Sequence, residues 1–106
     1  PDEPTVLFLG TYAYEPNVDA ANHLVHHIWP LVRQHVPQAR LLIAGSRCEV
    51  LRGFDAPPPG VQYLGFVDDL DALYARTRVV VCPILRGSGT RIKIIEAALA
   101  GRPVVA

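Results

Sequence analysis

Short apolar runs recur along the chain, and most of them stop at a residue that interrupts regular structure. Three of the runs end directly before Gly10, Gly45 and Pro83, and a weaker one ends before Gly65. Because apolar residues fill consecutive positions, both faces of each run would be buried, as in the strands of a parallel sheet. The predicted strands are Thr5–Leu9, Leu41–Ala44, Val61–Leu64 and Val79–Cys82, and Pro103–Val105 begins a fifth.

The segment between the first two predicted strands has the spacing of an amphipathic helix over Asp19–Gln34. Asn17 precedes this helix and can cap its first turn. Pro30 has no N–H to donate, so we expect a kink or an irregular last turn. The apolar positions, which share one helical face, are Leu24, Val25, Ile28, Leu31 and Val32.

Two further helices are predicted later in the chain. Asp68 is a candidate N-cap for the first of them, and the second covers Thr90–Ala100 and stops at Gly101. The stretch 46–60, between the second and third predicted strands, has room for one short helical turn before a proline-rich turn. The positions expected to face inward are Leu70, Leu73 and Tyr74 in one helix, and Ile92, Ile95 and Leu99 in the other.

Alternating strands and helices predict an α/β fold, a Rossmann-like, doubly wound parallel sheet of about five strands. A length of 106 residues suits a single domain. Because the sequence starts at Pro1 and contains no methionine, we expect it to be a piece of a longer protein. Ligands of such sheets bind beyond the carboxyl ends of the strands. The loops expected at that edge are 10–17, 45–47, 65–69 and 83–90.

Charge and cysteine content narrow the classes of partner. Ten basic and ten acidic residues cancel, which argues against nucleic acid, and no apolar run reaches the roughly 18 residues that span a bilayer. Cys48 and Cys82 lack the spacing of a metal site and are expected to be free thiols in the cytoplasm. His23, His26 and His27 lie off the apolar stripe of their helix, which favours a solvated face over a metal site.

The most informative loop for chemistry is Arg86–Lys93. Small residues allow a ligand to approach the backbone, and the predicted helix behind them begins with unpaired amide groups and a positive dipole. Arg91 and Lys93 add two cations in that first turn, where they oppose the dipole unless an anion is bound. We therefore predict an anion site; the alternative is a glycine loop with two solvated cations. Its residues are Gly87, Ser88, Gly89, Thr90, Arg91 and Lys93.

Two known phosphate motifs do not fit the sequence. No Gly-x-x-x-x-Gly-Lys-Ser/Thr segment is present, and the Gly-x-Gly-x-x-Gly pattern does not follow the first strand. Glu96 has apolar neighbours in the same predicted helix. Its carboxylate could accept hydrogen bonds from two ribose hydroxyls, or it could only pair with Lys93 one turn away. The sequence leaves these two interpretations nearly even.

Taken in order, these motifs resemble the C-terminal domain of the group 1 glycosyltransferases over essentially the whole chain. The matching segments are Phe8–Gly10, Pro16–Asp19, Leu42–Gly45, Leu64–Leu70, Cys82–Pro83, Gly87–Arg91, Lys93, Glu96–Ala97 and Ala100–Val105. The resemblance implies a GT-B architecture with two Rossmann-like domains and retaining transfer from a nucleotide-diphospho-sugar. It implies no metal and no cofactor, since the sugar nucleotide is a co-substrate.

Residue by residue, the resemblance implies contacts with each part of the donor. Glu96 would bind the ribose, Phe66 and Val67 would lie at the base, and Gly10 would approach the phosphates. Gly89, Thr90 and Arg91 would lie near the diphosphate or the sugar. The acceptor, whether a sugar, a lipid or another small molecule, would bind through an N-terminal domain. The reaction would take place in the cytoplasm, including at the inner membrane surface. No residue is assigned as catalytic.

The sequence departs from the family pattern at three positions. Ser88 stands where many members have the first of two glutamates, and Thr11 and Pro16 stand where many have an arginine and a lysine. Thr11 and Pro16 leave the loop after the first predicted strand without these two cations, and Arg91 and Lys93 are expected to supply the positive charge instead. The alternatives are a non-catalytic α/β module that binds a nucleotide or phosphorylated metabolite, and a nucleotide-sugar epimerase.

Overall fold

The computed structural model describes residues 4–81, which form a four-stranded parallel sheet with helices on both faces. The strand order is β3-β2-β1-β4, so the chain adds strands on one side of β1 and then crosses to its other side. This is the first part of the Rossmann order, and it confirms the predicted fold class. The strands are β1 (Thr5–Leu9), β2 (Arg40–Ala44), β3 (Val61–Gly65) and β4 (Val79–Val81).

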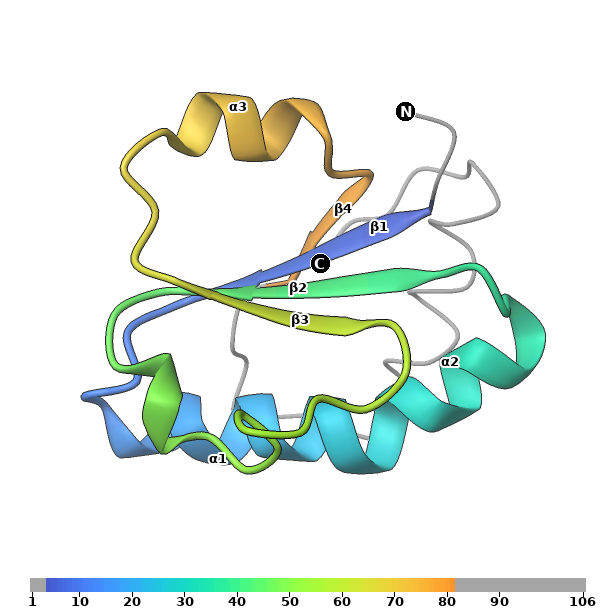
Figure 1. Ribbon diagram of the computed structural model, residues 1–106, viewed down its shortest axis with the longest axis horizontal. Coiled ribbons are helices and arrows are strands. Elements are labelled where there is room, and N and C mark those ends of the chain that lie inside the picture. Colours follow the sequence, from blue (N-terminus) through green and yellow to red (C-terminus); the bar gives the residue numbers. More distant parts are fainter. Residues whose placement is uncertain (1–3, 82–106) are drawn as a thin grey trace.

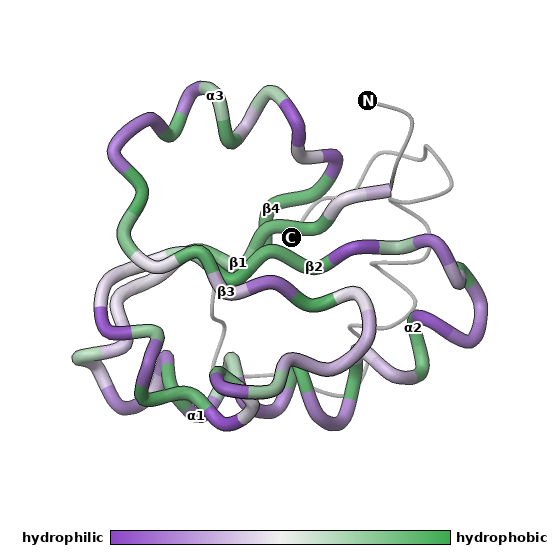
Figure 2. The backbone as a smooth tube through the Cα atoms, viewed as in Figure 1, coloured by the Kyte–Doolittle hydropathy of each residue, from purple (hydrophilic) through white to green (hydrophobic). Residues whose placement is uncertain are grey.

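Four of the predicted strands are present in the described range, and their described ends differ from the predictions by one residue at most; the predicted last residue of the fourth, Cys82, lies outside that range. The predicted strand Pro103–Val105 and the predicted helix Thr90–Ala100 lie outside the described residues. The two central strands are buried on both faces, which is why their sequences are apolar at consecutive positions. Figure 2 shows this as hydrophobic colouring along the middle of the sheet.

Helices cover the two faces unequally (Figure 1). One layer consists of α1 (Glu15–His23), the π-helical turn η1 (Leu24–Ile28) and α2 (Trp29–His35), and it packs on the larger core cluster with Val6, Phe8 and Ile43. The opposite face carries α3 (Leu70–Ala75) over the smaller cluster of Leu7, Leu42, Ala44 and Leu73. The result is a three-layer α/β/α arrangement.

The first helical layer differs from its prediction in register. In η1 the Trp29 N–H bonds to the Leu24 carbonyl, five residues back, so one extra residue enters the turn. The buried face therefore continues through Trp29 and Val32, whereas Leu31 is 41% exposed. The predicted inward position of Leu31 was wrong for this reason. The predicted irregularity near Pro30 is confirmed, since Pro30 follows η1 and lies in the first turn of α2.

The predicted N-cap at Asn17 was also wrong. The helix begins earlier, at Glu15, with Tyr14 as the N-cap residue and Pro16 in the first turn, a position that suits proline. The Asn17 side chain instead donates from Nδ2 to the carbonyl of Thr11 at 2.9 Å. It therefore holds the loop that leads out of β1 rather than the helix end.

The cap and the packing of α3 also differ from the predictions. Asp69, not Asp68, is the N-cap, and its Oδ1 accepts from the Ala72 N–H at 3.0 Å. Only Leu73 of the expected inward positions is buried; Leu70 and Tyr74 are 37% and 41% exposed. With its six residues, α3 turns a single buried position toward the sheet. The predicted turn after β2 is confirmed as the 3-10 turn η2 (Cys48–Val50).

Candidate functional site

The loops that follow β1, β2 and β3 lie side by side at the carboxyl edge of the sheet. Backbone hydrogen bonds join them beyond the strands: Gly10 N–H bonds to the Ala44 carbonyl at 3.2 Å, and Gly45 N–H bonds to the Gly65 carbonyl at 2.8 Å. Farther out, Tyr12 N–H bonds to the Ser46 carbonyl at 3.0 Å. The sequence-predicted meeting of these three loops is therefore confirmed.

Gly45 and Gly10 approach each other closely within this edge. Gly45 has φ +135°, a backbone conformation that side chains rarely adopt. A Cβ atom added there would overlap the Gly10 carbonyl oxygen and would lie 3.1 Å from Cε2 of Tyr12. Glycine is required at position 45 because the β1 loop passes directly over it.

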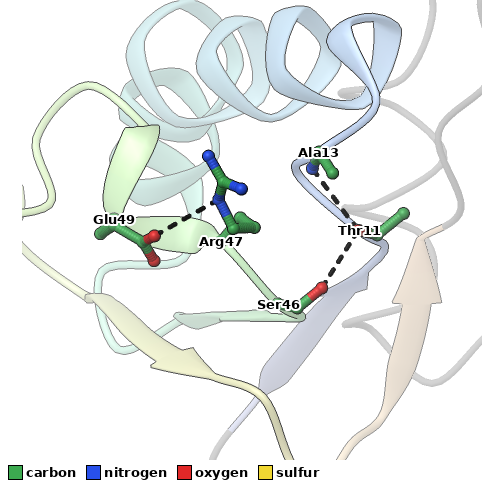
Figure 3. A network of polar contacts seen from close by, with 5 residues as sticks. All are labelled: Thr11, Ala13, Ser46, Arg47 and Glu49. Carbon is green, nitrogen blue, oxygen red and sulfur yellow. Dashed lines mark hydrogen bonds and ion pairs between the residues drawn. The ribbon is translucent and has the colours of Figure 1, made fainter.

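Polar side chains extend the contact between the β1 and β2 loops (Figure 3). The hydroxyls of Thr11 and Ser46 lie 3.1 Å apart, and the Ala13 N–H donates to Thr11 Oγ1 at 3.4 Å. Both hydroxyl-bearing residues are exposed, so this part of the edge is open to solvent. It presents small polar groups and backbone rather than apolar bulk.

Arg47 follows Ser46 in a left-handed conformation, with φ +68°. Among residues 4–81 it is the one residue other than glycine with a positive φ. Its Nε lies 3.6 Å from Oε2 of Glu49, and both side chains are largely exposed, at 62% and 59%. The turn lets Cys48, the next residue, enter the core as a free thiol whose pKa is raised by burial.

Tyr12 lies in the β1 loop but faces the core. It is 2% exposed, and its hydroxyl donates to the Ala44 carbonyl at 3.1 Å. Burial, with smaller contributions from Cys48 and Tyr63, raises the pKa of Tyr12 far above its usual range. Tyr12 therefore anchors the loop, whereas Tyr14 two residues later is 56% exposed.

Two predicted site residues follow β3 at the same edge. The Phe66 side chain is 72% exposed, which is high for a phenylalanine in a folded domain. Val67 is half-buried and packs against the smaller core cluster under α3. The structure thus brings Phe66 and Val67 to the same edge as Gly10, as the sequence predicted.

The strand order adds a feature that the loops alone do not have. The chain reverses direction across the sheet between β1 and β4, and in open α/β sheets ligands bind at such a switch point. Phe8 pairs with Val81, the last residue of β4, so Gly10 lies at the carboxyl side of this switch point. The other predicted site residues lie outside the described range; they are Gly87, Ser88, Gly89, Thr90, Arg91, Lys93 and Glu96.

Histidines of the first helical layer contact one another and the loop after β2. The rings of His23 and His27 stack with their centroids 5.3 Å apart, and His26 Nε2 lies 2.9 Å from the Arg52 carbonyl. In the part of the chain from 4 to 81, no three His, Cys, Asp or Glu side chains are grouped so as to hold a metal ion. None of the helices described there is long and apolar enough to cross a membrane.

The fold makes the chain a Rossmann-like α/β domain, a class whose ligands bind beyond the carboxyl ends of the strands. The family model described as "Glycosyl transferases group 1" matches residues 3–106. The chain therefore belongs to the group 1 glycosyltransferases, the family that its motifs resemble, and its substrates are a sugar donor and an acceptor. A search of the curated proteins finds no match.

Proposed function

We propose that this chain is the donor-binding, C-terminal domain of a retaining glycosyltransferase with GT-B architecture. Its donor is a nucleotide-diphospho-sugar, and the acceptor binds to a separate N-terminal domain. The observation that carries the proposal is the switch point between β1 and β4, beside which Gly10 and the joined loops of β1, β2 and β3 lie.

Each part of the donor then has a partner in this chain. Gly10 lets the backbone approach the diphosphate, and the segment Gly87–Lys93 supplies backbone amides and cations to the same group. The base lies against Phe66 and Val67, where an exposed aromatic ring can meet a planar heterocycle. Glu96 accepts hydrogen bonds from the ribose. No resident metal or cofactor is needed.

In the reaction, the bond between the anomeric carbon and the diphosphate oxygen breaks. A new bond forms between the acceptor oxygen and the same face of the anomeric carbon, the acceptor proton passes to the departing diphosphate oxygen, and the nucleoside diphosphate leaves. Negative charge develops on the leaving group, and Arg91 and Lys93 stabilise it. We place the reaction in the cytoplasm, including the inner membrane surface when the acceptor is a lipid.

Combining a change of Glu96 with a change of the donor ribose tests whether this residue binds the ribose. Glutamine at position 96 keeps the shape of the side chain but loses its charge, so Glu96→Gln should weaken donor binding by roughly 1–3 kcal/mol. A donor without the ribose hydroxyls should lose a similar amount. Because both changes remove the same interaction, the two losses should not add in a cycle of protein and donor variants. Calorimetric titration of the full-length protein measures all four affinities.

If Glu96 only pairs with Lys93 at the surface, Glu96→Gln should leave donor binding unchanged and shift stability by a few tenths of a kcal/mol. Fully additive losses in the cycle would likewise show that Glu96 does not contact the ribose.

Turnover separates the proposal from its two alternatives. The full-length protein is incubated with uridine, guanosine and adenosine diphosphate sugars, and free nucleoside diphosphate and the configuration of the transferred sugar are measured. We expect release of nucleoside diphosphate that depends on an acceptor, with retained configuration. Binding without release would favour the non-catalytic module, and a sugar nucleotide altered without release would favour the epimerase.

A further inference from the structure

Arg47 differs from the other described cations in where it lies. The described residues include six arginines and no lysine, and Arg47 alone belongs to a loop at the carboxyl edge. The loop after β1, residues 10–14, carries no charge, and the loop after β3 carries only the acidic pair Asp68 and Asp69. A diphosphate bound over Gly10 would therefore meet one described cation, Arg47.

The two loops are held together so closely that the backbone of Arg47 is fixed relative to Gly10. Gly45, two residues before Arg47, packs against the Gly10 carbonyl without room for a Cβ atom. Ser46, the residue before Arg47, bonds to both Tyr12 and Thr11. In Figure 3 the Arg47 side chain extends between Glu49 and the turn at Thr11 and Ala13.

The side chain is oriented but keeps donors free for a ligand. The contact with Glu49 is through Nε at 3.6 Å and leaves the two terminal nitrogens of the guanidinium as donors. These nitrogens form the fork that binds phosphate oxygens most effectively. A solvated ion pair of this kind contributes little to stability, so it does not by itself account for an arginine here.

The backbone conformation of Arg47 also supports a role in ligand binding. Glycine or asparagine occupies left-handed positions at lower cost than arginine does. Residues other than glycine in such conformations cluster at ligand-binding and active sites. We infer that Arg47 is a further diphosphate-binding residue, which supplies from the β2 loop the positive charge that the β1 loop lacks. The inference rests on the proposed function.

The test uses substitutions that separate charge from backbone. Arg47→Gly removes the guanidinium but suits φ +68°, so it should not lower the unfolding temperature of the full-length protein. Arg47→Gln removes the charge alone. Arg52→Gln is the matched control, because Arg52 is also exposed but its backbone lies against Asn22 and Tyr63 rather than at the carboxyl edge.

Uridine, guanosine and adenosine diphosphates and the three bare nucleosides are the probes in calorimetric titrations. We expect both Arg47 variants to bind the preferred diphosphate roughly tenfold or more weakly, and the matching nucleoside as wild type does. The difference should shrink at high salt, and Arg52→Gln should bind like wild type. Equal diphosphate binding by wild type and both Arg47 variants would overturn this inference alone. A wild-type protein that binds none of the diphosphates would overturn the proposed function with it.

Discussion

Replacing Gly45 with alanine is expected to destabilise the domain by roughly 3–5 kcal/mol and to abolish donor binding. The alanine Cβ would overlap the Gly10 carbonyl oxygen, which is backbone and cannot rotate away. Its φ of +135° is also unfavourable for any residue with a side chain. The β1 and β2 loops would have to separate, and the hydrogen bond from Gly10 to Ala44 would be strained or lost.

Gly65→Ala is the matched control for this effect. Gly65 also has a positive φ, +73°, but the nearest atom to an added Cβ is Cys48 Sγ at 3.9 Å, an ordinary contact. Its cost should be that of the left-handed conformation alone, roughly 1–2 kcal/mol. Chemical denaturation of the full-length protein and its two variants measures both free energies of unfolding. Similar values for Gly45→Ala and Gly65→Ala would contradict the close packing of the two loops.

Neutralising Arg91 and Lys93 together, by Arg91→Gln with Lys93→Gln, is expected to weaken nucleoside diphosphate binding by about 3 kcal/mol or more, roughly a hundredfold. Each cation would contribute a charge-assisted interaction with a phosphate oxygen. Binding of the bare nucleoside should change little, because neither side chain is expected to reach the base or the ribose. Removing the cations should also relieve their conflict with the dipole of the predicted helix, so stability should not fall.

The control for this pair removes two positive charges elsewhere. Arg52→Gln with Arg76→Gln changes the net charge of the protein equally, and both residues are exposed. This control should bind the diphosphate like wild type, so any loss in the first pair is local rather than a long-range effect of net charge. Equal losses for nucleoside and nucleoside diphosphate would mean that Arg91 and Lys93 do not recognise phosphate.

The strands were predictable because their signal is local. A run such as Leu41–Ala44 is apolar at every position, is short and ends at a glycine, which favours a strand that is buried on both faces. The carboxyl edge followed from the same runs, since each strand has a known direction. This is why Gly10, Phe66 and Val67 could be assigned to one edge from the sequence.

Features that depend on register or on contacts between distant segments were not predictable in this way. Leu31 was expected inside because a regular helix puts it there, but the extra residue in η1 turns it outward. Tyr12 belongs to the loop 10–17, which was expected at the carboxyl edge, but its side chain is buried and its hydroxyl donates to the Ala44 carbonyl, which is distant in sequence.

The proposed role of Arg47 could not be predicted from the sequence for a related reason. Its position beside the β1 loop follows from the packing of Gly45 on Gly10, a contact between distant residues that no local pattern encodes, and its left-handed backbone has no signal in the sequence. The signal that was available is the run Gly45-Ser46-Arg47 at the end of a buried strand, which marks a loop at the carboxyl edge but not the direction of its side chains.

The proposed function requires that a nucleotide-diphospho-sugar binds at the carboxyl edge of this sheet. Hydrogen exchange of the full-length protein, with and without a saturating nucleoside diphosphate, tests the location directly. We expect slower exchange on binding in peptides that cover residues 10–14, 45–48 and 66–69. We expect no change at the opposite edge, in peptides that cover 37–39 and 76–78. Slower exchange confined to that opposite edge or to the outer side of α1 and α2, with the carboxyl-edge loops unchanged, would contradict donor binding at the carboxyl edge.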